Sequence, residues 1–266
     1  MEKTAEKQSL KEKLKNLWSY FSLYERIWFI SILILSVIMA ILFPEEDING
    51  INGRLIMGFY LLNIASNVLC ELLISKQSKW NFIVSLVVEV TEIIIPILLA
   101  SRFATMATTV FFWIPIDIIS FINWNKHRDR ENAELTKVRK LNGWLKAVII
   151  IAIAVWTIGV GYLISELDIS TDFFKGNITL ETAVCYLDAC ASALGICNGV
   201  FIFLRIREQW LAWFVASVIE TLINILSGQY VLLVLKAGYF TNTVYGYIKW
   251  TKYIRSHNTD LDNTIL

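Results

Sequence analysis

Long apolar runs separated by short polar connections dominate the chain. A helix needs about 20 mostly apolar residues to cross the hydrocarbon core of a bilayer. The pattern therefore predicts an all-α integral membrane protein with eight transmembrane helices. The stretches are 27–43, 55–74, 82–100, 103–124, 146–165, 183–204, 210–226 and 230–250. The seventh is the shortest and is interrupted by polar residues.

Composition agrees with this pattern. Hydrophobic residues make up 56% of the 266 residues and charged residues only 18%, against about a quarter charged in soluble domains. The mean hydropathy is +0.56. The net charge of +1 gives no overall basic field. The lipid bilayer, and not nucleic acid, is therefore an expected partner.

The first 24 residues are polar and lysine-rich, and the first apolar run begins only near Ile27. This run begins too far from the N-terminus and is too long for the apolar part of a signal peptide, so we interpret it as a retained span. Residues 9–24 can form an amphipathic helix lying on the membrane surface.

Positive charges predict the orientation. Of the 24 Lys and Arg residues, 20 lie in the segments expected on one side of the membrane and three in the segments expected on the other side. The remaining one, Lys236, lies within the last span. Because cytoplasmic loops carry the excess of Lys and Arg, both termini are expected in the cytoplasm. We expect a multi-pass protein of a bacterial plasma membrane.

An internal repeat accounts for the order of the helices. When the sequence is aligned with itself at one fixed shift, two pairs of identical polar residues match. After a short gap in this alignment, a pair of tryptophans matches as well. The pairs are Asn67 with Asn198, Glu89 with Glu220, and Trp124 with Trp250. Each repeat holds three helices and one helix joins them, so the repeats share one orientation in a 3+1+3 parallel arrangement. The first span stands outside the repeat as an extra N-terminal helix.

This organisation divides the chain into five parts. They are residues 1–50, with the amphipathic segment and the extra helix; 51–124, the first repeat; 125–182, a charged cytoplasmic loop and the linking helix; 183–250, the second repeat; and 251–266, a cytoplasmic tail.

Polar groups inside the spans are the candidate functional residues, because they are costly in hydrocarbon. Glu89 and Glu92 share one helical face, as do Glu220 and Asn224. Under the repeat, Glu89 and Glu220 occupy matching places and can accept hydrogen bonds from a sugar or hold a proton. The alternative is that they only bond neighbouring helices.

Aromatic and amide side chains complete the predicted pocket. Trp113 and Asp117 lie one turn apart, and Tyr239 and Asn242 share a face of the last span. Stacking for a ring and hydrogen bonds for hydroxyls are what a flat heterocycle carrying a sugar needs. The candidate binding residues are Asn67, Glu89, Trp113, Asp117, Asn198, Trp213, Glu220, Asn224, Tyr239 and Asn242.

We assign other polar and aromatic residues to the membrane interface or to solvated helix ends. Trp124 and Trp250 end their spans and fit an aromatic belt at the membrane interface. Glu71 and Asp188 lie near span ends, where water can solvate them, although Glu71 also continues a polar stripe with Asn63 and Asn67.

No enzyme motif is present, neither a phosphate-binding loop nor a zinc-protease or hydrolase signature. The four cysteines all lie in apolar segments without a metal-binding spacing. We expect no catalytic residue, no metal site and no cofactor.

Residues 186–250 contain the W-x-x-W of Trp210 and Trp213, a short G-Q-Y turn at 228–230 and a closing Y-G-Y-x-x-W. With these motifs in this order, the segment resembles the PnuC family of vitamin and nucleoside transporters. The first repeat fits more loosely, from about Gly58 to Trp124, so the resemblance covers most of the chain. Ser217 stands where many members carry an acidic residue, which leaves the exact substrate open.

The resemblance implies facilitated diffusion of nicotinamide riboside without ion coupling, followed by trapping through a cytoplasmic kinase. Deoxynucleosides or thiamine are alternative substrates within the same family, and a membrane scaffold without transport is an alternative of another class. A homo-oligomer, trimer or dimer, is a further expectation.

Overall fold

The computed structural model describes residues 18–48, 50–99, 102–127, 137–138, 140–166, 176–256 and 264–265. The helices are α2 (Leu23–Leu42), α3 (Gly53–Ser75), α4 (Asn81–Leu99), α5 (Phe103–Thr108), the π-helix η1 (Thr109–Trp113), α6 (Ile114–Lys126), α7 (Gly143–Ser165), α8 (Ile178–Leu204), α9 (Gln209–Leu226), the 3-10 turn η3 (Tyr230–Leu232) and α10 (Leu233–Ser256). The short strands β1 (Lys140–Leu141) and β2 (Thr264–Ile265) pair in parallel. Most of the amphipathic helix predicted over residues 9–24 lies outside the described residues.

Among the described residues, seven helical segments are long and apolar enough to cross a membrane, with α5, η1 and α6 counted as one segment over Phe103–Lys126. Their positions agree with the first seven predicted spans. The eighth predicted span corresponds to α10, which has 24 residues but is too polar to be counted with them. The protein is therefore an all-helical, multi-span membrane protein apart from the two-residue strands.

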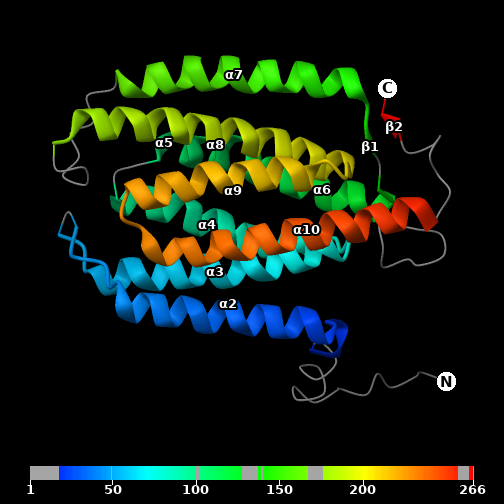
Figure 1. Ribbon diagram of the computed structural model, residues 1–266, viewed down its shortest axis with the longest axis horizontal. Coiled ribbons are helices and arrows are strands. Elements are labelled where there is room, and N and C mark those ends of the chain that lie inside the picture. Colours follow the sequence, from blue (N-terminus) through cyan, green and yellow to red (C-terminus); the bar gives the residue numbers. More distant parts are fainter. Residues whose placement is uncertain are drawn as a thin grey trace, which may run out of the picture.

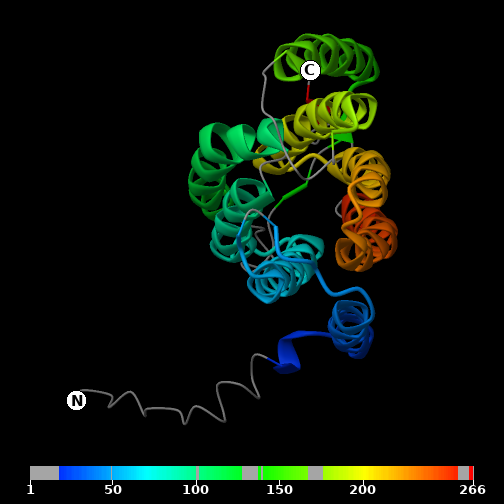
Figure 2. The same ribbon diagram turned by 90° about the vertical axis from the view of Figure 1, so that its left-hand side faces the viewer.

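The helices lie side by side around a centre. Figure 2, which looks along the helices, shows α3, α4, α6, α8, α9 and α10 surrounding this centre. The two remaining long helices, α7 and α2, lie outside it at opposite ends of the bundle (Figures 1 and 2). α7 packs mainly on α8, and its apolar surface is largely exposed, as expected for a helix in contact with lipid.

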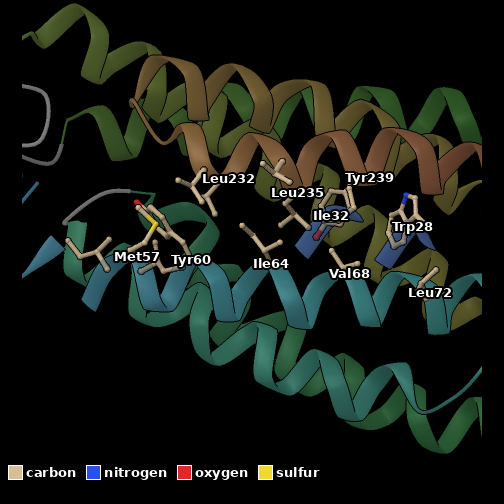
Figure 3. Packing of buried hydrophobic residues seen from close by; sticks show 14 of the residues in the cluster. Trp28, Ile32, Met57, Tyr60, Ile64, Val68, Leu72, Leu232, Leu235 and Tyr239 are labelled. Atoms are coloured by element: carbon tan, nitrogen blue, oxygen red, sulfur yellow. The ribbon is translucent and has the colours of Figure 1, made fainter. Parts of the chain in front are cut away.

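Helix α2 is held against α3 and α10 by a buried apolar cluster (Figure 3). Trp28 and Ile32 of α2 reach this cluster, and a side chain at Gly238 of α10 would come within 3.5 Å of both. The Trp28 indole N–H also donates to the Thr241 hydroxyl at 2.9 Å. The apolar cluster and this hydrogen bond together attach α2 to α10.

The same turn follows two helices in different halves of the chain. Gln77 after α3 and Arg205 after α8 both adopt the left-handed conformation, with φ of 57° and 63°. Each donates its backbone N–H to the carbonyl three residues earlier, and the next N–H reaches back five residues. Helices α3 and α8 therefore end in the same way.

Two tryptophans exchange contacts across the bundle at these helix ends. The Trp124 indole N–H donates to the Ile202 carbonyl at 2.9 Å, and the Trp250 indole N–H donates to the Ile74 carbonyl at 3.3 Å. Their rings lie 6.2 Å apart. The last four carbonyls of a helix lack partners within the helix, so each indole supplies a donor there.

The predicted aromatic belt is wrong for these two residues. Trp124 is 1% exposed and Trp250 is fully buried, whereas belt residues face the lipid headgroups. They pack inside the bundle because each has an apolar ring to bury and a donor that meets a helix end.

We expect Gly246→Ala to destabilise the protein. Gly246 of α10 packs against the Trp210 ring so closely that an added Cβ would overlap the ring. Overpacking of this kind costs about 1–3 kcal/mol, which a thermal unfolding measurement in detergent can detect.

Gly58→Ala is the matched control, because Gly58 lies in α3 with no atom within 4 Å of an added Cβ. Replacing glycine by alanine within a helix stabilises by roughly 0.5–1 kcal/mol. Equal melting temperatures of the two variants would contradict this packing.

The connection between α2 and α3 is a compact turn. Ile48 and Ile51 form an isolated bridge, and the Gly53 N–H donates to the Asp47 carboxylate at 2.8 Å. Burial, together with the charge of Glu46, raises the pKa of Glu45 to about 7. The folded protein thus holds a proton here that the unfolded chain has released.

A proton bound more tightly in the folded state makes stability fall as the pH rises. We expect a decrease between about pH 5 and about pH 8 that Glu45→Gln removes, worth roughly 1–2 kcal/mol at a partly solvated site. Melting temperatures at both pH values measure it. Identical pH profiles of wild type and variant would contradict this prediction.

Candidate functional site

A cavity lies between α3, α4, the α5–η1–α6 segment, α8, α9 and α10. Seven of the ten residues predicted from the sequence line it: Asn67, Glu89, Trp113, Asp117, Trp213, Glu220 and Tyr239. They come from several different spans, so the bundle brings together positions that lie far apart in the sequence.

Aromatic rings form one wall of the cavity. Trp113 and Trp213 meet edge to face with centroids 6.4 Å apart, and Trp213 lies 5.2 Å from Tyr239. Aromatic surfaces of this kind bind flat ring systems by stacking.

Local backbone structure places Trp113. It ends the π-helix η1, in which the Ile114 N–H bonds to the Thr109 carbonyl five residues back. Pro115 has no N–H to continue the normal pattern, and a π-bulge is a common response at functional sites. Gly195 of α8 faces the indole, and an added Cβ there would lie 3.4 Å from its nitrogen.

Five carboxylates also line the cavity: Glu71, Glu89, Glu92, Asp117 and Glu220. Four of them accept hydrogen bonds from a neighbouring helix. The donors are Asn242 to Glu71 at 2.8 Å, Asn63 to Glu92 at 3.1 Å, Ser85 to Asp117 and Lys236 to Glu220. Buried charges are tolerated when they are paired in this way.

The fifth carboxylate, that of Glu89, differs. Its side chain is 4% exposed, and neither of its oxygens has a hydrogen-bond donor among the described residues.

A polar chain runs along the wall formed by α3 and α10. The Tyr239 hydroxyl donates to the Asn67 side-chain oxygen at 2.6 Å, and the Asn67 amide donates to the Asn63 side-chain oxygen at 3.1 Å. The ammonium of Lys236 lies 4.8 Å from the centre of the Tyr239 ring. The hydroxyl of Tyr239 is therefore fixed while its ring faces the cavity.

Three predicted residues lie outside the cavity lining. Asn242 is buried and binds Glu71. Asn198 and Asn224 are also buried, and neither is among the lining residues. Asn198 lies between the lining residues Gly195 and Ile202 of α8, and Asn224 lies one turn beyond Glu220 of α9. Both therefore share the inward faces of their helices, although their side chains do not line the cavity.

The expectation that Glu71 and Asp188 are solvated is wrong. Glu71 is 3% exposed and lines the cavity, and Asp188 is 2% exposed. Asp188 accepts the Ala104 N–H at 2.9 Å, is bonded by the Thr105 hydroxyl and lies 3.9 Å from the Arg102 guanidinium. The stripe of Asn63, Asn67 and Glu71 at four-residue spacing was the signal that Glu71 faces inward.

Arg102 joins two helices at the end of the cavity where α4 meets α5. It lies 3.9 Å from Glu220 of α9 and the same distance from Asp188 of α8. Such a buried ionic group ties the α4–α5 connection to the opposite half of the bundle.

No group of three or more His, Cys, Asp and Glu residues in the part of the chain that the structure describes has an arrangement suited to a metal ion. The four cysteines are free thiols, with Cys70 buried and the others half-buried.

Comparisons with known proteins agree with this architecture. A family model described as nicotinamide mononucleotide transporter matches residues 58–252. A protein of Haemophilus influenzae named nicotinamide riboside transporter PnuC is 22% identical over 253 residues, which cover 94% of this chain and 97% of that protein. Its namesake from Neisseria mucosa is 23% identical over 261 residues, 93% of this chain and 87% of the relative.

The fold is also that of a solved structure. A crystal structure described as the vitamin B3 transporter PnuC superposes with a TM-score of 0.70 at 20% identity, covering 94% of this chain and all of the other. The family model spans well over half of the chain. This protein therefore belongs to the nicotinamide mononucleotide transporter family, the family of the PnuC transporters.

Proposed function

We propose that the protein imports nicotinamide riboside across a bacterial plasma membrane. The observation that carries this proposal is the meeting of three aromatic rings with five carboxylates around one cavity. The aromatic faces suit the pyridinium ring, whose positive charge also favours carboxylates, and the polar groups suit the ribose hydroxyls. The names of the two relatives support the same substrate.

Each cavity residue receives a role in this proposal. Trp113 and Tyr239 stack on the ring, with Trp213 between them. Hydrogen bonds to the ribose or the carboxamide come from Asn67, Glu89, Asp117 and Glu220. Asn242 acts indirectly by holding Glu71, and we assign no substrate contact to Asn198 and Asn224.

We propose eight spans in a 3+1+3 arrangement, with α10 as the eighth span. At 24 residues, α10 is long enough to cross, and its polar residues Lys236, Asn242 and Thr243 are buried within the bundle. The recurring turns and the exchanged tryptophans support the repeat, but in a register that aligns Gln77 with Arg205. In that register Glu92, rather than Glu89, corresponds to Glu220.

The proposed units keep the boundaries given above, with repeats over 51–124 and 183–250 joined by 125–182. Both termini lie in the cytoplasm in this proposal, as the distribution of Lys and Arg favours. A dimer or trimer is part of the proposal.

The proposed transport is facilitated diffusion, in which a cytoplasmic kinase traps the riboside by phosphorylation. The chain is not an enzyme in this proposal. Thiamine is the second candidate, because it is also a cationic aromatic compound that suits the carboxylates. A neutral deoxynucleoside suits them less well.

Binding of nicotinamide riboside to the purified protein, measured by calorimetry beside thiamine and deoxyadenosine, tests the substrate. We expect the riboside to bind and Asp117→Asn to weaken its binding at least about tenfold, because a charge beside the ring is lost.

Glu46→Gln is the matched control, since it also turns a carboxylate into an amide but lies outside the cavity. Binding of thiamine or deoxyadenosine in place of the riboside would change the substrate. Unchanged riboside affinity in Asp117→Asn would refute the pocket.

Proteoliposomes test the transport mode. With facilitated diffusion, labelled riboside inside the vesicles stops rising once it equals the outside concentration. A riboside kinase and ATP enclosed in the vesicles should then produce continued accumulation. Accumulation above the outside concentration without the kinase would contradict facilitated diffusion.

A further inference from the structure

The cavity contains a positive charge to which the proposed function gives no role. Lys236 of α10 is the one lysine, arginine or histidine among the described residues that line the cavity. Its side chain is 9% exposed. A buried ammonium is costly unless a carboxylate or an aromatic ring compensates it. The partners of this ammonium therefore matter for how the cavity receives a charged ligand.

Two groups compensate the Lys236 ammonium, and both are candidate ligand contacts. The ammonium is bonded to the carboxylate of Glu220 in α9, and its nitrogen lies 4.8 Å from the centre of the Tyr239 ring. A carboxylate and the face of an aromatic ring are also the partners that favour a positively charged ligand. Lys236 thus makes, from within the protein, the contacts that a cationic ring would make with Glu220 and Tyr239.

The other cavity carboxylates have no such cation among the described residues. Three of them have neutral donors. For Glu71, Glu92 and Asp117 in turn, these donors are Asn242, Asn63 and Ser85. Both oxygens of Glu89 are without a donor in the described part of the chain. An internal cation therefore competes with a ligand's positive charge at Glu220 and Tyr239, and not along the rest of the wall.

We infer that Lys236 sets the charge selectivity of the cavity by competing with a cationic ligand for Glu220 and Tyr239. The inference rests on the proposed function and adds a specificity-determining residue to it. A pyridinium ring that stacks on Tyr239 repels the ammonium, because like charges a few ångströms apart interact strongly away from bulk water. The ammonium must then leave the Tyr239 ring. A neutral ring can lie beside the ammonium without this repulsion, so Lys236 lowers the affinity for cations selectively.

Glu220 keeps a second cation when the charge of Lys236 is removed. The Arg102 guanidinium lies 3.9 Å from Oε1 of Glu220, whereas Lys236 is bonded to Oε2. A buried carboxylate that loses its sole partner destabilises a fold, but this one does not lose its sole partner. Glutamine is the preferred replacement for Lys236, because its amide can still donate to Glu220 without carrying a charge.

The same helix supplies a matched control. Lys249 of α10 also lies over a tyrosine ring, 5.2 Å from the centre of Tyr245, and is bonded to a carboxylate, that of Glu25, at 3.2 Å. Glu25 likewise has a second cation, Lys76, at 3.3 Å. Lys249 does not line the cavity. Lys249→Gln therefore removes the same charge from the same kind of contact without altering the ligand site.

Nicotinamide riboside and its reduced, uncharged dihydropyridine form test the inference, because they have nearly the same shape and differ in ring charge. Calorimetry with the purified full chain gives the affinity for each. We expect the ratio of riboside affinity to reduced-form affinity to rise at least about tenfold in Lys236→Gln. Lys236→Arg, which keeps the charge, and Lys249→Gln should retain the wild-type ratio. Lys236→Met serves as a second neutral variant.

An unchanged or lower ratio in the neutral variants would overturn the inference. So would an equal rise in Lys249→Gln, because the effect would then come from the net charge of the protein. In each of these cases the riboside binds, so the proposed function stands. No binding of the riboside to the wild type or to any variant overturns both.

Structures of the wild-type protein with each ligand give a readout that does not depend on a variant folding. With the riboside bound, we expect the Lys236 ammonium to lie away from the Tyr239 ring. With the reduced form bound, it should remain bonded to Glu220. An ammonium that stays over Tyr239 in the riboside complex would overturn the inference and leave the proposed function intact.

Discussion

A carboxylate in the hydrocarbon region of a membrane needs donors from the protein, because neither lipid nor bulk water supplies them. In this bundle nearly every buried carboxylate finds its donor on another helix, so each pairing also joins two helices. The joined helices are α3 with α10 through Glu71, α3 with α4 through Glu92, α4 with α6 through Asp117, α9 with α10 through Glu220 and α5 with α8 through Asp188. Together these contacts run around most of the cavity and fix the helices that line it.

Different interactions join the helices at the two ends of the bundle. At the end where α4 meets α5, Arg102 joins carboxylates of α8 and α9. At the other end, Trp124 and Trp250 each cap a helix from the opposite half of the bundle.

The aromatic wall and the paired carboxylates belong to one cavity. Trp113, Trp213 and Tyr239 line it together with carboxylates whose partners lie within the protein, except at Glu89.

The sequence by itself determined where the apolar helices begin and end, because hydrophobic length alone decides whether a segment can cross a bilayer. It also identified which residues are polar within those helices, and seven of ten candidates line the cavity. Only the tertiary structure decided where each polar face points. Trp124 and Trp250 end their helices like belt residues but turn inward, and Glu71 lies near a helix end yet faces the cavity. Contacts between segments that are distant in the sequence set the rotation and packing of each helix. A local pattern of residues does not contain this information.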